Sequence, residues 1–196
     1  MRFRAALTSS HPHPIFVRSP LPPEEPAETW LRPGLTAPLR AAAISLEVRR
    51  NLADRRGPVH GGAFLRERRI VFDAETVSDP REFARIFVHE VFHFVWLRLG
   101  NPRRWSYEAL LGEELRACAR GELGWSAEWR KRRLAPRDMG RRTVRWREYC
   151  CESFCDTAAW LYSGVSAHPE YSLARRFREA RRRWFERADV SKRMSI

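Results

Sequence analysis

The sequence predicts an α+β fold that is predominantly helical, with a small sheet placed just before the clearest helix. Apolar residues recur at helical spacing over most of the chain, whereas alternation of the strand type is concentrated in residues 61–75. The chain contains no internal repeat and no Gly-rich phosphate loop. Its 196 residues are enough for one domain with a substantial core.

Proline usage divides the chain into two parts. Eight of the 13 prolines lie within residues 1–38, including the stretch SPLPPEEP. Proline removes a backbone donor and disfavours helix, so we expect residues 1–36 to form an extended or flexible arm. Residues 37–196 are then expected to form the folded domain.

The first part of that domain is predicted to supply one helix and the sheet. Residues 37–57 favour a helix that ends near Gly57. Residues 61–75 predict a hairpin, because the stretch RIVFD at 69–73 alternates in hydrophobicity and is rich in β-forming residues. The sheet therefore precedes the remaining helices.

The clearest helix is expected at residues 80–98. Asp79 fits the N-cap, Pro80 fits the first helical position, and Gly100 follows the last turn. Four more helices are expected downstream, at 106–123, 126–134, 141–164 and 168–190.

Composition limits the classes of function. No apolar run is long enough to span a membrane and the N-terminus lacks an apolar signal segment, so we expect a soluble, cytoplasmic protein. The net charge of +13 attracts nucleic acid at low salt, but charge alone supports such a partner only weakly. The four cysteines form no CxxC pair, so we expect free thiols rather than a cysteine-based zinc site.

The helix at 80–98 contains HEVFH, in which three polar residues interrupt an apolar run. His89 and His93 are one turn apart on one face of the helix, so their ring nitrogens can bind a single Zn²⁺ ion. Glu90 points about 100° around the helix. It is then outside the ligand set but close enough to take a proton from a zinc-bound water. Without such a partner, these buried polar groups would be costly.

A catalytic zinc ion usually has three protein ligands and one open position, so a third ligand must come from elsewhere. His168 is one candidate, and the others are carboxylates on the predicted helix 141–164. Glu148, Glu152 and Asp156 follow one another at four-residue steps and line one face of that helix. The rest of this segment is apolar or small, so the acidic stripe needs a cation.

HExxH followed by a downstream helix carrying ExxxD resembles the pattern of the gluzincin metallopeptidases, the thermolysin-like branch of the zincins. The matching stretches are HEVFH and ESFCD. The resemblance implies a zincin-like core in which His89, His93 and Glu152 bind Zn²⁺, with Glu148 as the alternative third ligand. It also implies that Asp156 accepts the outer N–H of a ligand histidine. At this length, the chain is similar to minimal forms such as the minigluzincins or the ImmA/IrrE-like regulatory peptidases.

These residues predict a zinc metallopeptidase, a hydrolase that cleaves a peptide or protein substrate with Glu90 as the general base. The oxyanion-stabilising residue is left open among His168, Tyr162, Tyr149 and Tyr171. The alternative is a regulatory or binding protein on the same scaffold, which holds structural zinc and acts on nucleic acid or a repressor. The presence of Glu90 argues against that alternative, because a binding site has no need of a base there. The sequence makes no prediction of oligomeric state.

Overall fold

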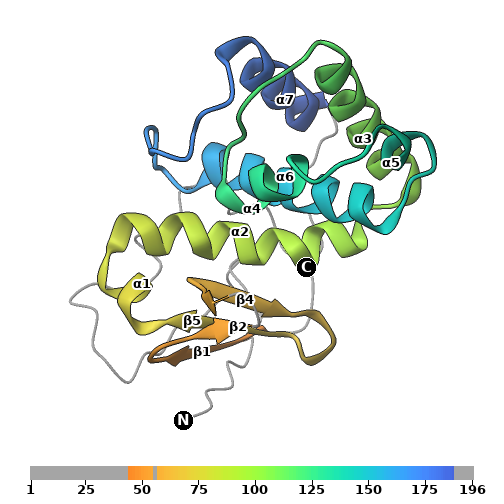
Figure 1. Cartoon of the computed structure of the whole chain (residues 1–196). Helices are drawn as coiled ribbons and strands as arrows, with labels where there is room; N and C mark the ends of the chain where they lie inside the picture. Colours follow the sequence, from red (N-terminus) through yellow and green to blue (C-terminus); the bar gives the residue numbers. More distant parts are fainter. Residues whose placement is uncertain (1–43, 55–56, 188–196) are drawn as a thin grey trace.

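The computed structural model describes residues 44–54 and 57–187 (Figure 1). The arm predicted at residues 1–36 lies outside the described residues. The described part is α+β and mostly helical, as predicted, and its small sheet precedes the helix that carries HExxH. Within these residues, no helix combines the length and the apolar character that crossing a bilayer requires.

A three-stranded sheet forms one side of the described structure. Its strands are β1 (Ser45–Arg49), β4 (Gly61–Phe64) and β5 (Arg69–Asp73). The strand order is β1-β5-β4, with β1 parallel to β5 and β4 antiparallel to it. The β4–β5 pair is the hairpin that the sequence predicts, and β4 is left at an edge of the sheet.

The prediction of a helix at residues 37–57 is wrong for the residues of this range that the structure describes. This segment forms β1 and a short antiparallel pair, β2 (Ala53–Asp54) with β3 (Gly57–Pro58). Ile44 and Leu46 are only 1% and 5% exposed, and the intervening Ser45 is half-buried, so the burial has the period of a strand. Pairing with β5 stabilises this conformation, and local helix propensity does not anticipate that distant partner.

The HExxH motif lies on α2 (Pro80–Arg98), which has the bounds that its caps predict. Asp79 accepts hydrogen bonds from the backbone N–H groups of Arg81 and Glu82, two of the donors that a helix leaves free in its first turn. A short helix that the sequence did not predict, α1 (Ala74–Ser78), joins β5 to α2.

The four downstream helices are present with shifted bounds, and one short helix is added. Together, the five helices of this part of the chain are α3 (Asn101–Arg116), α4 (Trp125–Lys131), α5 (Pro136–Gly140), α6 (Val144–Tyr162) and α7 (Arg175–Arg187). The added helix is α5. The last helix begins later than predicted because the preceding loop is held in another conformation. The backbone N–H groups of Ser172 and Leu173 donate to the carbonyl of Glu122 instead of continuing a helix.

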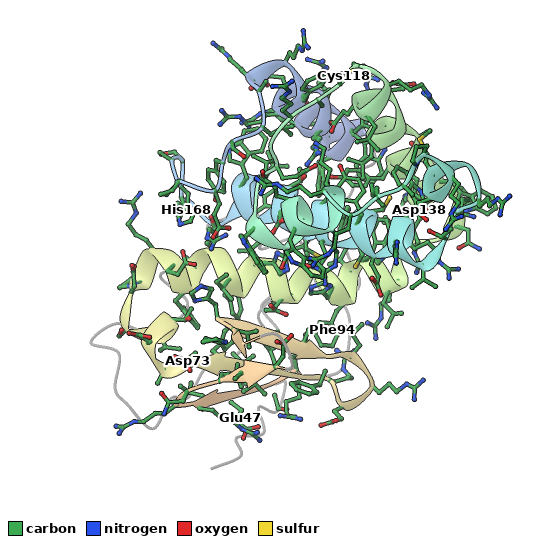
Figure 2. The ribbon with its side chains drawn as sticks, viewed as in Figure 1. Glu47, Asp73, Phe94, Cys118, Asp138 and His168 are labelled. Carbon is green, nitrogen blue, oxygen red and sulfur yellow. The ribbon has the colours of Figure 1, made fainter. Side chains whose placement is uncertain are left out.

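Helix α2 lies between the sheet and a second layer of helices, with α6 along its far face (Figure 1). Figure 2 shows Phe94 between α2 and the sheet, where it is fully buried. On the other face, Phe92 stacks on Tyr162 of α6, with ring centroids 5.6 Å apart. Because α2 is covered on both sides, its polar motif lies in the core, where side chains of α6 can reach it.

Candidate metal centre

The three ligands favoured by the sequence meet where α2 passes α6. The Nε2 atoms of His89 and His93 are 3.2 Å apart, and Oε2 of Glu152 is 3.3 Å from Nε2 of His89. One ligand atom from each residue lies within 4.8 Å of the others, so this group can hold a metal ion. We refer to these three residues, with Glu90 and Asp156, as the histidine cluster.

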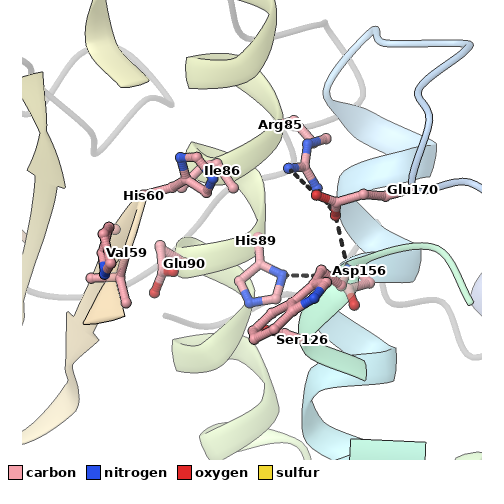
Figure 3. Close-up of a pocket in the computed structure, with 12 residues that line it drawn as sticks. Val59, His60, Arg85, Ile86, His89, Glu90, Ser126, Asp156 and Glu170 are labelled. Atoms are coloured by element: carbon pink, nitrogen blue, oxygen red, sulfur yellow. Dashed lines mark hydrogen bonds and ion pairs between the residues drawn. The ribbon is translucent and has the colours of Figure 1, made fainter. Parts of the chain in front are cut away.

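The gluzincin resemblance implies that Asp156 contacts a ligand histidine, and in the structure Asp156 lies beside His89. Its Oδ1 is 2.7 Å from Nδ1 of His89 (Figure 3), whereas Glu152 faces the other ring nitrogen, Nε2. When the Nδ1–H donates to this carboxylate, the Nε2 lone pair is free for a metal ion. The other carboxylate oxygen of Asp156, Oδ2, accepts a hydrogen bond of 3.3 Å from the backbone N–H of Ala127 at the start of α4.

The other candidate third ligands do not join the group. Glu148 is exposed on α6, whereas Glu152 is largely buried. His168 lies in the loop before α7, with its Nε2 3.3 Å from a carboxylate oxygen of Glu82. Among the described residues, Glu152 is therefore the carboxylate that completes the set with the two histidines.

Glu90 opens onto a pocket of about 390 Å³ beside the cluster. Figure 3 shows Val59 and His60 on the side of Glu90, with Ser126 and Glu170 across the pocket. Glu90 is only 7% exposed, and burial raises its pKa. The charges of His93 and His89 act in the opposite direction. A carboxylate with a raised pKa at the edge of a pocket is suited to accept and return a proton.

The four residues considered for an oxyanion role do not line this pocket. Tyr149 donates a 2.6 Å hydrogen bond to Glu122 on another face of α6, and Tyr162 packs among aromatic rings. His60, which the sequence analysis did not single out, does line it. Its Nδ1 lies 3.1 Å from the hydroxyl oxygen of Thr76.

Buried charges set the protonation of the cluster. Burial lowers the pKa of His93, but the neighbouring Cys151, Glu152 and Glu90 outweigh it and raise that pKa to about 9. Burial also opposes the charge on His89, yet the charge and hydrogen bond of Asp156 raise its pKa well above the usual value. The pKa of Glu152 falls to about 2, because the two imidazoles and Arg130 outweigh the effect of burial. The cluster thus attracts positive charge strongly.

Sequence analysis did not predict the contact between Cys151 and His93. Its sulfur lies 3.4 Å from Nδ1 of His93 and so takes the place that Asp156 has beside His89. Together with Cys155, these residues form a second group that could hold a metal ion, and this group shares His93 with the first. The two cysteines are spaced i,i+4 on the ligand helix, which is a signal that the sequence did contain.

Helix α4 contributes two further features that no local pattern predicts. Nη2 of Arg130 forms an ion pair with Oε1 of Glu152 at 3.1 Å. Gly124, the residue before α4, lies very close to α6. A Cβ atom at this position would be 2.2 Å from Cγ of Asp156. Only glycine allows this approach. A short helix from the middle of the chain therefore contacts both Glu152 and Asp156.

Comparisons with known proteins identify no relative of this chain. No protein-family model, no curated protein and no solved structure matches it.

Proposed function

We propose that this protein is a zinc-dependent peptide hydrolase with a zincin-like core. The observation that carries the proposal is the spacing of the donor atoms. Atoms bound to a tetrahedral zinc ion at about 2.0–2.1 Å lie about 3.3–3.4 Å from one another. Two of the three spacings, 3.2 Å between the histidine nitrogens and 3.3 Å from His89 to Glu152, agree with that value. The third, from His93 to Glu152, is within 4.8 Å.

The chemistry of the donors supports zinc over harder cations. Two imidazole nitrogens and one carboxylate oxygen are typical of a catalytic zinc site, which keeps its fourth position open. Calcium and magnesium prefer sets made of oxygen atoms alone. Asp156 supports the same conclusion, because a carboxylate behind a ligand histidine fixes the tautomer that binds metal.

Each protein group then has a role in hydrolysis. Zinc, when bound, supplies a Lewis acid and lowers the pKa of water to about 7. Glu90 takes the proton from the attacking water and delivers it to the leaving amine. His89, His93 and Glu152 hold the reacting centre at the edge of the pocket that Glu90 lines.

The pocket favours an extended peptide as substrate. Its wall includes His60 and Gly61, at the start of β4, and β4 is an edge strand of the three-stranded sheet. The free edge of a strand offers backbone donors and acceptors that can pair with an extended chain. A peptide bound alongside β4 would bring its backbone carbonyls close to Glu90.

The test compares wild type with Glu90→Gln, after zinc loading, on a mixed peptide library. We expect both proteins to bind one zinc ion, and the variant to lose about 10²–10⁴-fold in kcat/KM, the usual effect of removing a general base. Glu113→Gln, on the exposed face of α3, is the matched control and should retain activity. A zinc-loaded wild type that cleaves no peptide would favour the alternative of a regulatory or binding protein.

A further inference from the structure

Arg130 is unusually placed for an arginine on the surface layer of helices. Its side chain is only 17% exposed. Nη2 forms an ion pair with Oε1 of Glu152 at 3.1 Å, and Nη1 donates a hydrogen bond to the carbonyl of Ser126 at 3.0 Å. Its Nε is buried without a hydrogen-bond partner in the described part of the chain. Leaving a buried donor unpaired is costly, so the contact with Glu152 is retained despite a local penalty.

The contact with Arg130 gives the two oxygen atoms of Glu152 different partners. Oε2 faces Nε2 of His89, whereas Oε1 is held by the guanidinium group. A carboxylate can bind a metal ion through one oxygen or through both. An ion pair with one oxygen favours the first mode, because binding through both would require that ion pair to weaken.

The same helix restrains the other carboxylate of the centre. The backbone N–H of Ala127 donates to Oδ2 of Asp156, while Oδ1 faces His89. Ala127 contacts Asp156 through its backbone, and Arg130 contacts Glu152 through its side chain. In each case, α4 binds the oxygen that does not face His89.

We propose that Arg130 is a positioning residue that makes Glu152 bind the metal ion through Oε2 alone. The proposal rests on the function proposed above, in which Glu152 is the third zinc ligand. A single bound oxygen keeps a coordination position open for the water that hydrolysis needs. Loss of Arg130 would release Oε1 to bind as well, which would raise the coordination number from four to five, crowd the position of the water and lower turnover without removing a ligand.

The experiment replaces zinc with Co²⁺, whose visible absorption weakens as its coordination number rises from four to five. Wild type, Arg130→Ala and Arg130→Lys are compared with Arg132→Ala, a control at the C-cap of the same helix whose side chain is 76% exposed and pairs with Glu128. We expect Arg130→Ala to keep one Co²⁺ per chain with a weaker spectrum. Its kcat on the zinc form should fall about 10–100-fold, the usual range for an outer partner of a ligand, with a smaller change in KM.

Lysine at position 130 should restore part of the wild-type spectrum and turnover, because an ammonium group can hold one oxygen but lacks the planar fork of arginine. Arg132→Ala should match wild type. If Arg130→Ala fails to fold, Arg130→Gln tests the same point, since an amide cannot supply the charge. An unchanged Co²⁺ spectrum in the folded variant would overturn the proposal, and so would complete loss of metal binding. Failure of wild type to bind either metal would instead overturn the proposed function.

Discussion

The histidine cluster can be compared with a second buried set of charges, Arg181, Glu114, Glu122 and Lys131, referred to here as the arginine cluster. Arg181 is completely buried and donates to Glu114 at 2.7 Å and to Glu122 at 2.8 Å. The ammonium group of Lys131 lies 3.0 Å from Glu122. Two carboxylates therefore face two cations, and the charges balance without any bound ion.

The histidine cluster has no such balance. It contains three carboxylates, Glu90, Glu152 and Asp156, and within the described residues its one ion pair with a permanently charged cation is that of Glu152 with Arg130. The Cys151 sulfur beside His93 adds to the negative character, because its pKa is lowered to about 6. Protons on the imidazoles, whose pKa values are raised, would offset this charge, and so would a divalent cation. Both clusters are largely buried, so the missing cation is the difference that would let the histidine cluster bind a metal ion.

The largest effect is expected from breaking the arginine cluster. Arg181→Met leaves two buried carboxylates without their main partner, which should lower the free energy of unfolding by about 3–5 kcal/mol. Arg183→Met, at an exposed position of the same helix, should change it by less than about 0.5 kcal/mol. Urea denaturation of both variants measures this difference, and equal stabilities would show that Arg181 is not the centre of the network.

Zinc should stabilise the protein through the histidine cluster alone. At a free zinc concentration about 1,000 times Kd, the free energy of unfolding should rise by about 4 kcal/mol. Arg181→Met should gain as much as wild type, whereas His93→Ala should gain little. Thermal denaturation with and without zinc tests this point. A zinc response that Arg181→Met has lost would mean that the two clusters are coupled.

An intermediate effect is expected from disturbing Asp156 without touching a ligand. In Gly124→Ala, the new methyl group would lie on the Asp156 carboxylate, which must then move. Zinc affinity should fall about 10–100-fold, as for Asp156→Asn, because each change releases the outer nitrogen of His89. Gly140→Ala meets no atom within 4 Å and is the control. Competition with a chromogenic chelator gives the affinities, and wild-type affinity in Gly124→Ala would contradict the role of Asp156.

The smallest effect concerns pH. The pKa of His93 is raised from 6.5 to about 9 in the folded metal-free protein. The resulting stabilisation is complete below about pH 6.5. It is lost as the pH rises through 9. Between pH 7 and 8, each such imidazole lowers the stability by up to about 1.4 kcal/mol. The zinc-bound protein, whose imidazoles are already neutral, should lack this decline. Denaturation of both forms across this range measures it, and parallel curves would contradict the charge argument.

Most residues of the histidine cluster could be singled out from the sequence because their signals are local. The caps of α2 place His89, Glu90 and His93 on a defined helix, and the i,i+4 spacing puts Glu152 and Asp156 on one face of another. The distance from each carboxylate to its histidine, however, depends on how α2 and α6 pack, which no spacing within one helix fixes.

The features that sequence analysis missed depend on contacts between distant segments. Arg130 reaches Glu152 only because α4 packs on α6, and Gly124 is required only by that close approach. Strand β1 was predicted as a helix for the same reason, since its conformation is stabilised by pairing with β5. Local propensity carries no information about these partners.

The central claim is that the histidine cluster exchanges protons for a divalent cation. Isothermal titration calorimetry of zinc into the metal-free protein at pH 7, in buffers of different ionisation enthalpy, measures both the stoichiometry and the protons released. We expect one zinc ion per chain and the release of about two protons, one from each imidazole. Zinc binding without proton release, or no binding, would contradict the claim.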